Sequence, residues 1–252
     1  MKTDFSKTLF RCSSLSKLMT EPKLKADKEA GLLSETAKSY LIDVYVYTMY
    51  NRRNDFTNKY VQKGLAIEED SITLYSRIKK EFFQKNEKLL KNDYIKGTPD
   101  LFKGKTIKNA EVIIDIKSSW DIFTYFGTYT KSMNKDYWWQ LQGYMALTGA
   151  KSARLAYCLL NTPDMLISDE KRMMMYKMGA LTNESPEYLK ACKEIELAMK
   201  YDDIPLERRL NEFYIERDDE AITNLYSKIN KARVFLTNFH NELEVVYDTQ
   251  KI

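Results

Sequence analysis

The segment 95-IKGTPDLFKGKTIKNAEVIIDIKS-118 decides the fold of this chain. It predicts two β-strands joined by a turn: residues 94–102 form the first strand and residues 111–118 the second. The second strand is a β-branched run interrupted by Asp115 and Lys117. Because successive side chains of a strand point to opposite faces, we expect both charged side chains on one face and the neighbouring isoleucines on the other.

Charged side chains inside an apolar strand indicate a binding or catalytic site. A buried carboxylate or ammonium is costly unless it is paired or binds something. If Asp100 arrives from the adjacent first strand, two carboxylates and a lysine converge at one place. Hard divalent cations prefer oxygen ligands, and a metal with a lysine beside it suits hydrolysis of a phosphodiester.

The same residues have a simpler interpretation. An Asp and a Lys at a strand end often form a solvated salt bridge, and the Gly-Thr-Pro-Asp of residues 97–100 is also an ordinary turn signal. A turn aspartate followed 15 residues later by the D-x-K strand makes the two interpretations about equally plausible. The rest of the chain has to discriminate between the two interpretations.

The composition is that of a globular protein. The chain has 252 residues, of which 44% are apolar and 30% charged, and this length is ample for a substantial core. No apolar run approaches the roughly 20 residues that span a bilayer, and the start of the chain lacks the apolar stretch of a signal peptide. The net charge of +4 is compatible with a polyanionic partner but does not require one.

Cysteine and histidine usage excludes several chemistries. Cys12, Cys158 and Cys192 are far apart and form no C-x-x-C, so we expect neither a disulfide framework nor a zinc or iron–sulfur cluster, which fits a reducing cytoplasm. His240 is the sole histidine, which argues against a His-ligated metal and against a Ser-His triad. Any active site would therefore depend on carboxylates and lysine.

Helical and strand periodicities alternate along the whole chain. Helices are predicted over residues 13–20, 34–53, 58–80, 121–126, 134–149, 168–179, 185–200 and 218–246, and further strands within 79–92 and over 152–160 and 212–217. Residues 23–33 are expected to form a loop. Without repeats or a convincing boundary, 1–252 is predicted to be one domain, in which residues 1–80 form a helical region, 81–165 the core and 166–252 a second helical region. Strands flanked by helices imply a mixed sheet with helical cover.

Two predicted helices carry residues that could support a site. Gln140 and Tyr144 are four residues apart, so they share one helix face and could hold a phosphate or steady a lysine. Glu68 could hold a metal-bound water or act as a ligand, and Gly64 would allow another backbone to approach closely. Each feature alone is also typical of ordinary surface: a half-buried helix face for the first pair, and a solvated acidic cluster for Glu68.

Taken together, the order of these motifs resembles that of the PD-(D/E)XK nuclease superfamily, and within it the RecB-like and phage lambda-type exonuclease branch with its YqaJ-like viral recombinases. The resemblance covers most of the chain. The matching segments are SSLSKLM (13–19), GLAIEEDSITLY (64–75), KGTPDLF (96–102), VIIDIKS (112–118), QLQGYMALTG (140–149) and FYIERDDEAI (213–222). Each segment is short, but their shared order is specific.

The resemblance implies a restriction-endonuclease-like α/β fold with three layers: a central mixed sheet flanked by helices, with extra N- and C-terminal helices. It also implies that Asp100 and Asp115 bind Mg²⁺ or Mn²⁺, with the backbone carbonyl of Ile116 completing the set. Glu68 would join the metal directly or through water. Many relatives have Glu where this chain has Asp115, a departure that shortens the reach by one methylene but stays within the superfamily pattern.

The resemblance assigns the remaining catalytic roles as well. Lys117 would orient the attacking water and help to deprotonate it, and Gln140 and Tyr144 would position the scissile phosphate and the lysine. The cysteines that hold an iron–sulfur cluster in some RecB-like relatives are absent, so this chain should lack one.

DNA contacts are expected in two places. Ser14 and Arg11 would contact a terminal phosphate or the DNA backbone, because the family's N-terminal helix lies near the DNA. Lys103 and Lys105, in the turn between the two key strands, are candidate phosphate contacts if DNA passes near Asp100, although such charge runs are also typical of solvated surface. The implied partners are DNA, chiefly linear duplex ends, and a single-strand annealing protein. Some relatives form trimeric rings.

The function implied is a metal-dependent DNA exonuclease that degrades linear duplex DNA from an end, 5′ to 3′, in phage-type recombination or DNA end processing. It would act in the cytoplasm, of a bacterial host if phage-encoded, with no membrane partner. Two alternatives stay open: a structure- or site-specific endonuclease of the same fold, and a non-catalytic DNA-binding scaffold. The intact Asp100, Asp115 and Lys117 argue against the scaffold, since a dead relative need not retain them.

Overall fold

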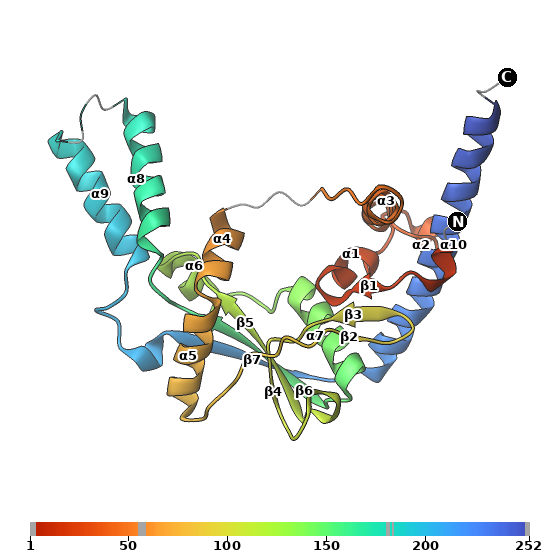
Figure 1. Cartoon of the computed structure of the whole chain (residues 1–252), viewed down its shortest axis with the longest axis horizontal. Coiled ribbons are helices and arrows are strands. Elements are labelled where there is room, and N and C mark those ends of the chain that lie inside the picture. The colour runs from red at the N-terminus through yellow and green to blue at the C-terminus, as the bar shows by residue number, and fades with distance from the viewer. Residues whose placement is uncertain (1–3, 55–58, 180–181, 183, 250–252) are drawn as a thin grey trace.

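The computed structural model describes residues 4–54, 59–179, 182 and 184–249. In outline the molecule is U-shaped, with the β-sheets and helix α7 (Lys135–Thr148) at the base (Figure 1). The antiparallel helices α8 (Asp164–Met178) and α9 (Pro186–Met199) form one arm, and the C-terminal end of helix α10 (Asp219–Thr249) forms the other.

Four strands form the central sheet. They are β4 (Leu101–Lys103), β5 (Val112–Ser118), β6 (Ser152–Cys158) and β7 (Leu210–Glu216). Their order in the sheet is β4-β5-β6-β7; β5 and β6 are parallel, and the other two pairs are antiparallel. The mixed sheet expected from the sequence is therefore present, and the strands predicted over 111–118, 152–160 and 212–217 are confirmed to within two residues at each end.

The expected single strand over 94–102 is wrong, because the chain changes sheets within it. A small second sheet of order β1-β3-β2 contains β1 (Phe10–Arg11), β2 (Leu90–Lys91) and β3 (Ile95–Gly97). The break between β3 and β4 includes Pro99, which has no N–H for a ladder and whose carbonyl accepts a hydrogen bond of 2.8 Å from Asn86 Nδ2. Asp100 consequently lies where the chain passes from one sheet into the other. Of the described residues 79–92, only β2 forms a strand.

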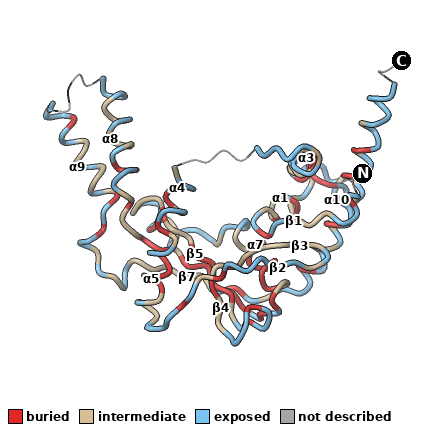
Figure 2. Tube along the Cα trace, in the orientation of Figure 1, coloured by how far each residue is buried: buried red, intermediate tan, exposed pale blue. Residues whose placement is uncertain are grey.

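Strand β5 lies between two helices, which gives the three layers. Helix α5 (Glu68–Lys79) covers one face and α7 covers the other. Ile114 and Ile116 pack in the cluster on the α5 side, whereas Ile113 packs in the larger cluster on the α7 side. The predicted alternation along β5 is confirmed. Buried segments in the base of the molecule are concentrated along β5 and β6 (Figure 2).

The other helices lie mainly before the central sheet. They are α1 (Leu15–Leu18), α2 (Lys25–Glu29), α3 (Glu35–Tyr50), α4 (Lys59–Ala66) and α6 (Ile122–Gly127), with 3₁₀ turns at Phe5–Lys7, Cys12–Ser14, Ile107–Asn109 and Leu206–Arg208. Two predicted helix ends are confirmed. The Ser34 hydroxyl caps α3 by accepting a hydrogen bond from the backbone N–H of Ala37, and Gly149 ends α7 with φ of 80°.

Three predictions for the first 80 residues are wrong. The single helix expected over 58–80, whose first residue lies outside the described residues, is broken at Ile67, where φ is −116° and ψ is 15°. Glu68 therefore sits in the first turn of α5 rather than in mid-helix, at the end of the helix dipole that favours negative charge. The expected loop over 23–33 contains α2. A Cβ at Gly64 would meet nothing within 4 Å, so this glycine serves no close approach of another described backbone.

The two arms differ from the base in burial. Along α8, α9 and the end of α10 most of the trace is exposed or intermediate, whereas the base is largely buried (Figure 2). Although α10 has 31 residues, no helix among the described residues is both long and apolar enough to cross a membrane.

Candidate active site

The chemistry-bearing side chains of β5 lie on its α7 face. Asp115 is fully buried, and Lys117 Nζ lies 2.6 Å from its Oδ2. From α7, Gln140 Nε2 donates a hydrogen bond of 3.2 Å to Asp115 Oδ1. Asp115 Oδ2 accepts no well-directed hydrogen bond from any described residue, even though the lysine is close. One buried carboxylate oxygen therefore has spare capacity as a ligand.

Asp100 joins this pair from the edge of the sheet. Its Oδ2 accepts a hydrogen bond of 2.8 Å from the backbone N–H of Ile116, just beyond the last β4–β5 pair, Leu101 with Ile114. Because the N–H and C=O of one strand residue point toward the same neighbour, the Ile116 carbonyl faces this edge too. Burial and the nearby charge of Asp115 raise the pKa of Asp100 to about 7, against the opposing effect of Lys117.

Lys117 stays protonated in this arrangement. Burial alone would lower its pKa, but the charges of Asp115 and Asp100 outweigh that effect and raise the pKa above the usual value for lysine. The ammonium also lies 4.9 Å from the centre of the Tyr137 ring, a favourable cation–π distance. Lys117 is therefore a fixed cation beside two carboxylates.

Gln140 and Tyr144 form a chain of hydrogen bonds behind Asp115. Besides Asp115, Gln140 Nε2 donates to the Tyr144 hydroxyl at 2.9 Å. Tyr144 is 5% exposed, and burial together with the charge of Asp115 raises its pKa far above the usual value, so it remains a neutral phenol. Both residues of the predicted pair are brought to the site. In this arrangement Gln140 touches the carboxylate directly and Tyr144 acts on it through Gln140.

Gly97 is a supporting residue that sequence reasoning missed. A Cβ at this position would lie 2.6 Å from Tyr144 Cε1 and 3.0 Å from Cys12 Sγ. The absence of a side chain therefore lets the Tyr144 ring pack against β3. The sequence signal was present, since Gly97 precedes Thr98-Pro99-Asp100, but it indicated only a turn.

Glu68 lies at the rim of the group. Its Oε2 accepts a hydrogen bond of 2.7 Å from Lys85 Nζ, and its negative charge contributes to raising the pKa of Asp100. In the described arrangement Lys85, rather than a site residue, holds this carboxylate. Glu68 is thus near the site but directed to a lysine that sequence reasoning did not single out.

The donor set fits a hard divalent cation. Among the described residues no group of three or more His, Cys, Asp or Glu side chains is placed to hold a metal, so the protein ligands would be two carboxylates and a carbonyl. Asp115 Oδ2 is paired with the Lys117 ammonium alone, and the raised pKa of Asp100 indicates that one lysine does not offset both carboxylates. Mg²⁺ is commonly held by one or two carboxylates with substrate and water completing its shell.

The fold is shared with known exonucleases, although no family model and no curated protein matches the chain. It is similar to the crystal structure of a phage-related exonuclease from Haemophilus somnus 129PT, with 28% identity and a TM-score of 0.74, covering 94% of this chain and 97% of that one. The alkaline exonuclease from Laribacter hongkongensis is also similar, with 16% identity and a TM-score of 0.62 over 98% of this chain and 96% of that one. Its complex with dAMP gives 15% identity and a TM-score of 0.63 over 97% and 96% of the two chains.

These likenesses to phage-related and alkaline exonucleases agree with the predicted lambda-exonuclease-like branch of the PD-(D/E)XK nuclease superfamily. The predicted superfamily and fold class are confirmed. In this nuclease fold, Asp100 and the Asp115–Lys117 pair occupy the end of the β4–β5 hairpin where the two strands separate.

The predicted DNA contacts fall into two groups. Arg11 and Ser14 line a cavity of about 360 Å³ between the N-terminal segment, α3 and β3. Its charged lining residues are Lys7, Arg11, Lys17, Arg53 and Lys96, with Asp4 and Asp43 as the acidic ones. The cavity is thus predominantly basic, and β3 leads from it directly to Asp100.

Lys103 and Lys105 lie at the other end of β4. Lys103 pairs with Glu81 and its Nζ lies 5.4 Å from the centre of the Phe83 ring, and Lys105 is exposed in the turn after β4. Lys103 is three positions after Asp100 along the chain, which corresponds to roughly 10 Å of strand. The structure therefore does not bring these two lysines to the carboxylates.

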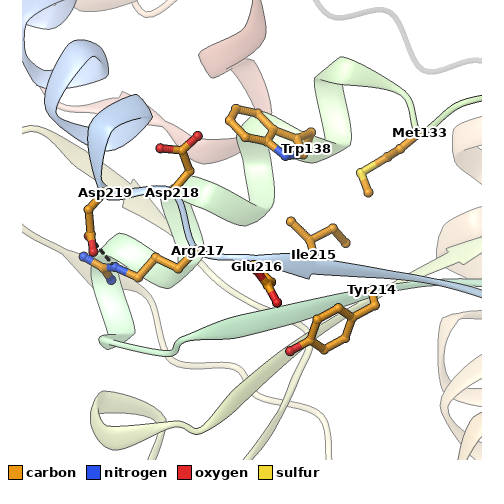
Figure 3. A pocket seen from close by; sticks show the side chains of 8 residues that line it. All are labelled: Met133, Trp138, Tyr214, Ile215, Glu216, Arg217, Asp218 and Asp219. Atoms are coloured by element: carbon orange, nitrogen blue, oxygen red, sulfur yellow. Dashed lines mark hydrogen bonds and ion pairs between the residues drawn. The ribbon is translucent and has the colours of Figure 1, made fainter.

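A second cavity, of about 510 Å³, is separate from the candidate active site. It lies between the start of α7 and the edge strand β7 and is lined by Met133, Trp138 and residues 214–219 (Figure 3). Glu216, Asp218 and Asp219 make it acidic, with Arg217 paired to Asp219. An acidic lining of this kind is unfavourable for a phosphate-bearing ligand.

Proposed function

We propose that this protein is a divalent-metal-dependent DNA exonuclease that hydrolyses phosphodiester bonds at the ends of linear duplex DNA, in the 5′ to 3′ direction. The observation that carries the proposal is the convergence of Asp100, Asp115 and Lys117 beside β5, on a fold similar to that of two exonucleases. The direction of cleavage rests on the family resemblance alone.

Each residue of the group has a role that follows from its contacts. Asp100, Asp115 and the Ile116 carbonyl would hold Mg²⁺ or Mn²⁺, which supplies Lewis-acid polarisation of the phosphoryl group and a water of lowered pKa. Gln140 keeps the Asp115 carboxylate in one orientation, and Tyr144 keeps Gln140 in place.

Lys117 would orient the attacking water by donating a hydrogen bond from Nζ and would stabilise negative charge that develops on the phosphate oxygens. Because its pKa is raised, Nζ carries its proton in the described arrangement and is not itself a proton acceptor there. Glu68 would contribute only after its bond to Lys85 is exchanged for a bond to a metal-bound water.

The basic cavity supports an end-directed activity. A terminal phosphate is more highly charged than an internal one, and Arg11 with Ser14 offers a bidentate cation and a hydroxyl for it. Lys96 on β3 is two residues from Thr98 and four from Asp100, so a strand end held in the cavity would lie close to the carboxylates. By resemblance, we extend the proposal to a trimeric ring, a single-strand annealing partner and phage-type recombination.

The test is digestion of end-labelled linear duplex DNA and of closed circular plasmid, with Mg²⁺ or with EDTA. Wild type is compared with Lys117→Ala and, as a matched control, with Lys193→Ala on the exposed surface of α9. We expect metal-dependent loss of the linear DNA only, abolished by Lys117→Ala and unaffected by Lys193→Ala.

Other outcomes would redirect the proposal. Nicking of the circular plasmid would assign a structure- or site-specific endonuclease. Binding of DNA without cleavage of either form would assign a non-catalytic scaffold. Full activity in Asp115→Ala would remove the proposed site altogether.

A further inference from the structure

A short element directly after the candidate site presents aromatic rings to solvent. Helix α6 starts four residues after β5 ends, and the Asp121 side chain caps it by accepting a hydrogen bond from Thr124 N. Phe123, Phe126 and Tyr129, on α6 and the turn that follows, are 75%, 48% and 54% exposed. Large exposed rings grouped beside a site indicate a binding surface rather than a core.

The rings are held on a fixed base. Tyr125, from the same helix, is fully buried, and its hydroxyl donates a hydrogen bond of 2.9 Å to the Arg208 carbonyl. Thr128 Oγ1 accepts a hydrogen bond of 2.8 Å from Asn211 Nδ2 on β7. The Phe126 and Tyr129 rings stack on each other, with centres 6.0 Å apart and planes at 27°. Their outer faces are therefore preorganised, which lowers the entropy cost of binding a flat partner.

The charges near these rings favour an anionic partner. Exposed Lys131 and Lys135 follow the aromatic turn, and Lys117 precedes it. Between Lys117 and Lys135 the one acidic residue is Asp121, whose carboxylate already caps α6. Aromatic rings flanked by lysines are typical of surfaces that bind single-stranded nucleic acid, because unpaired bases stack on the rings while the lysines contact the phosphates.

We propose that Phe123, Phe126 and Tyr129 form a stacking surface for the unpaired bases of single-stranded DNA. This inference rests on the proposed function, because removal of one strand of a duplex leaves a single strand next to the site. Bases within a duplex are already stacked on their neighbours and cannot use such rings, so the surface selects the unwound strand. Along the chain, Phe123 follows Lys117 by six residues and Tyr129 follows it by twelve.

The test measures binding without cleavage. A fluorescein-labelled oligo(dT) is titrated in EDTA, and fluorescence anisotropy gives its Kd for wild type and for Phe126→Ala/Tyr129→Ala. Phe82→Ala removes an exposed ring between α5 and β2, away from the proposed surface, and is the control. We expect roughly tenfold weaker binding or more for the double variant, the range that loss of base–aromatic stacking produces, and no change for the control.

Measuring Kd at several salt concentrations separates the contribution of base stacking from that of the lysine–phosphate contacts. Lys131→Ala/Lys135→Ala should reduce the slope of log Kd against log salt by roughly 0.7 for each phosphate that is no longer neutralised, whereas removal of the rings should leave the slope unchanged. The melting temperature of every variant is measured to show that α6 remains folded, as the unaltered Tyr125 anchor predicts.

Three outcomes would overturn the inference. One is a double variant that binds oligo(dT) as tightly as wild type, and another is a wild type that does not bind oligo(dT). The third is a double variant that binds normally but self-associates less in sedimentation, which would assign the rings to a second copy of this chain. Degradation of linear duplex, measured on the same proteins, is a separate readout. If the wild type degrades duplex DNA and the double variant binds oligo(dT) as tightly as wild type, only the stacking surface is ruled out. If the wild type does not degrade duplex DNA but the double variant binds oligo(dT) more weakly, only the exonuclease activity is ruled out.

Discussion

Two lysines lie in apolar surroundings, Lys117 at the candidate active site and Lys63 where α4 meets the β5–α6 connection, and their electrostatic situations are opposite. Lys63 is 1% exposed, and its Nζ donates a hydrogen bond of 2.6 Å to the Trp120 carbonyl. Burial lowers the pKa of Lys63 to about 8, and the more distant charge of Asp121 only partly opposes this. Burial acts in the same direction on Lys117, but two adjacent carboxylates reverse the result.

The comparison shows that burial sets the cost of a charge and that neighbouring carboxylates decide whether the charge is kept. At Lys117 the cation and the carboxylates stabilise one another, which leaves a concentrated charged site ready for a phosphate and a metal. At Lys63 the ammonium is held by a carbonyl and lies 5.8 Å from the ring centres of Trp120 and Tyr201. Lys117 should therefore matter for activity, and Lys63 for stability.

The largest expected effect separates the two lysines by activity. Lys117→Met should lower the rate of duplex degradation by roughly 10²–10³-fold, because it removes a preorganised charge at the point of reaction. Lys63→Met should change the rate by less than about twofold. Single-turnover digestion of end-labelled duplex measures both. Equal losses in the two variants would show that the contrast between the lysines does not extend to function.

Gly97→Ala tests whether the packing of Tyr144 against β3 holds Gln140 and Asp115 in place beside Lys117. The new Cβ would overlap Tyr144 Cε1, so the ring must move and the Tyr144–Gln140–Asp115 chain with it. We expect a loss of activity of about tenfold and a loss of about 1–3 kcal/mol in the free energy of unfolding, as in other overpacked cores. Activity and urea denaturation are measured together.

Gly64→Ala is the matched control for Gly97→Ala. Gly64 lies within α4, and a Cβ there meets nothing within 4 Å, so the change should stabilise the helix by up to about 1 kcal/mol. A Gly97→Ala protein as stable and active as the Gly64→Ala protein would show that Tyr144 is not held against β3.

The stability of Lys63→Met tests whether burying the Lys63 charge costs free energy. A pKa lowered from 10.5 to about 8 corresponds to a penalty on the order of 3 kcal/mol at neutral pH, offset to some extent by the bond to Trp120. We therefore expect Lys63→Met to stabilise the protein by about 1–2 kcal/mol at pH 7.

The difference in the free energy of unfolding between Lys63→Met and wild type should decrease as the pH rises. Below pH 8 Lys63 is charged in both the folded and the unfolded protein, so the penalty is present in full. Between about 8 and 10.5 only the unfolded protein binds the proton, so wild-type stability rises with pH relative to the variant. Urea denaturation of both proteins from pH 7 to pH 10 should show the gap closing, and a constant gap would contradict the lowered pKa.

The smallest expected effect concerns Lys85, the partner of Glu68. The ion pair is about 30% exposed on each side, so Lys85→Ala should change the free energy of unfolding by less than about 1 kcal/mol. With Glu68 released, the Mg²⁺ concentration that gives half-maximal activity should fall, and Glu68→Gln should raise it. If neither variant shifts the Mg²⁺ dependence, Glu68 lies outside the site.

Most of the sheet and the pairing of residues within single elements were predictable. The D-x-K strand needed only the two-residue period of β5, and Gln140 with Tyr144 needed only the helical period of α7, because both are local properties of the backbone. The errors occurred where distant residues compete with local pattern. The strand over 94–102 divides at Pro99, whose carbonyl accepts a hydrogen bond from Asn86, and the helix over 58–80 breaks at Ile67, after which α5 packs against β5.

The residue order alone thus determined the superfamily, the mixed sheet and the identity of the charged side chains on one face of β5. It did not determine that Asp100 would meet the Ile116 amide at the junction of two sheets, that Lys85 would hold Glu68, or that Tyr144 would pack into the space left by Gly97. Nor did it indicate that Lys63 would be buried. These features depend on contacts between residues distant along the chain, and the charge state of a buried group is set by those contacts rather than by its own sequence neighbours.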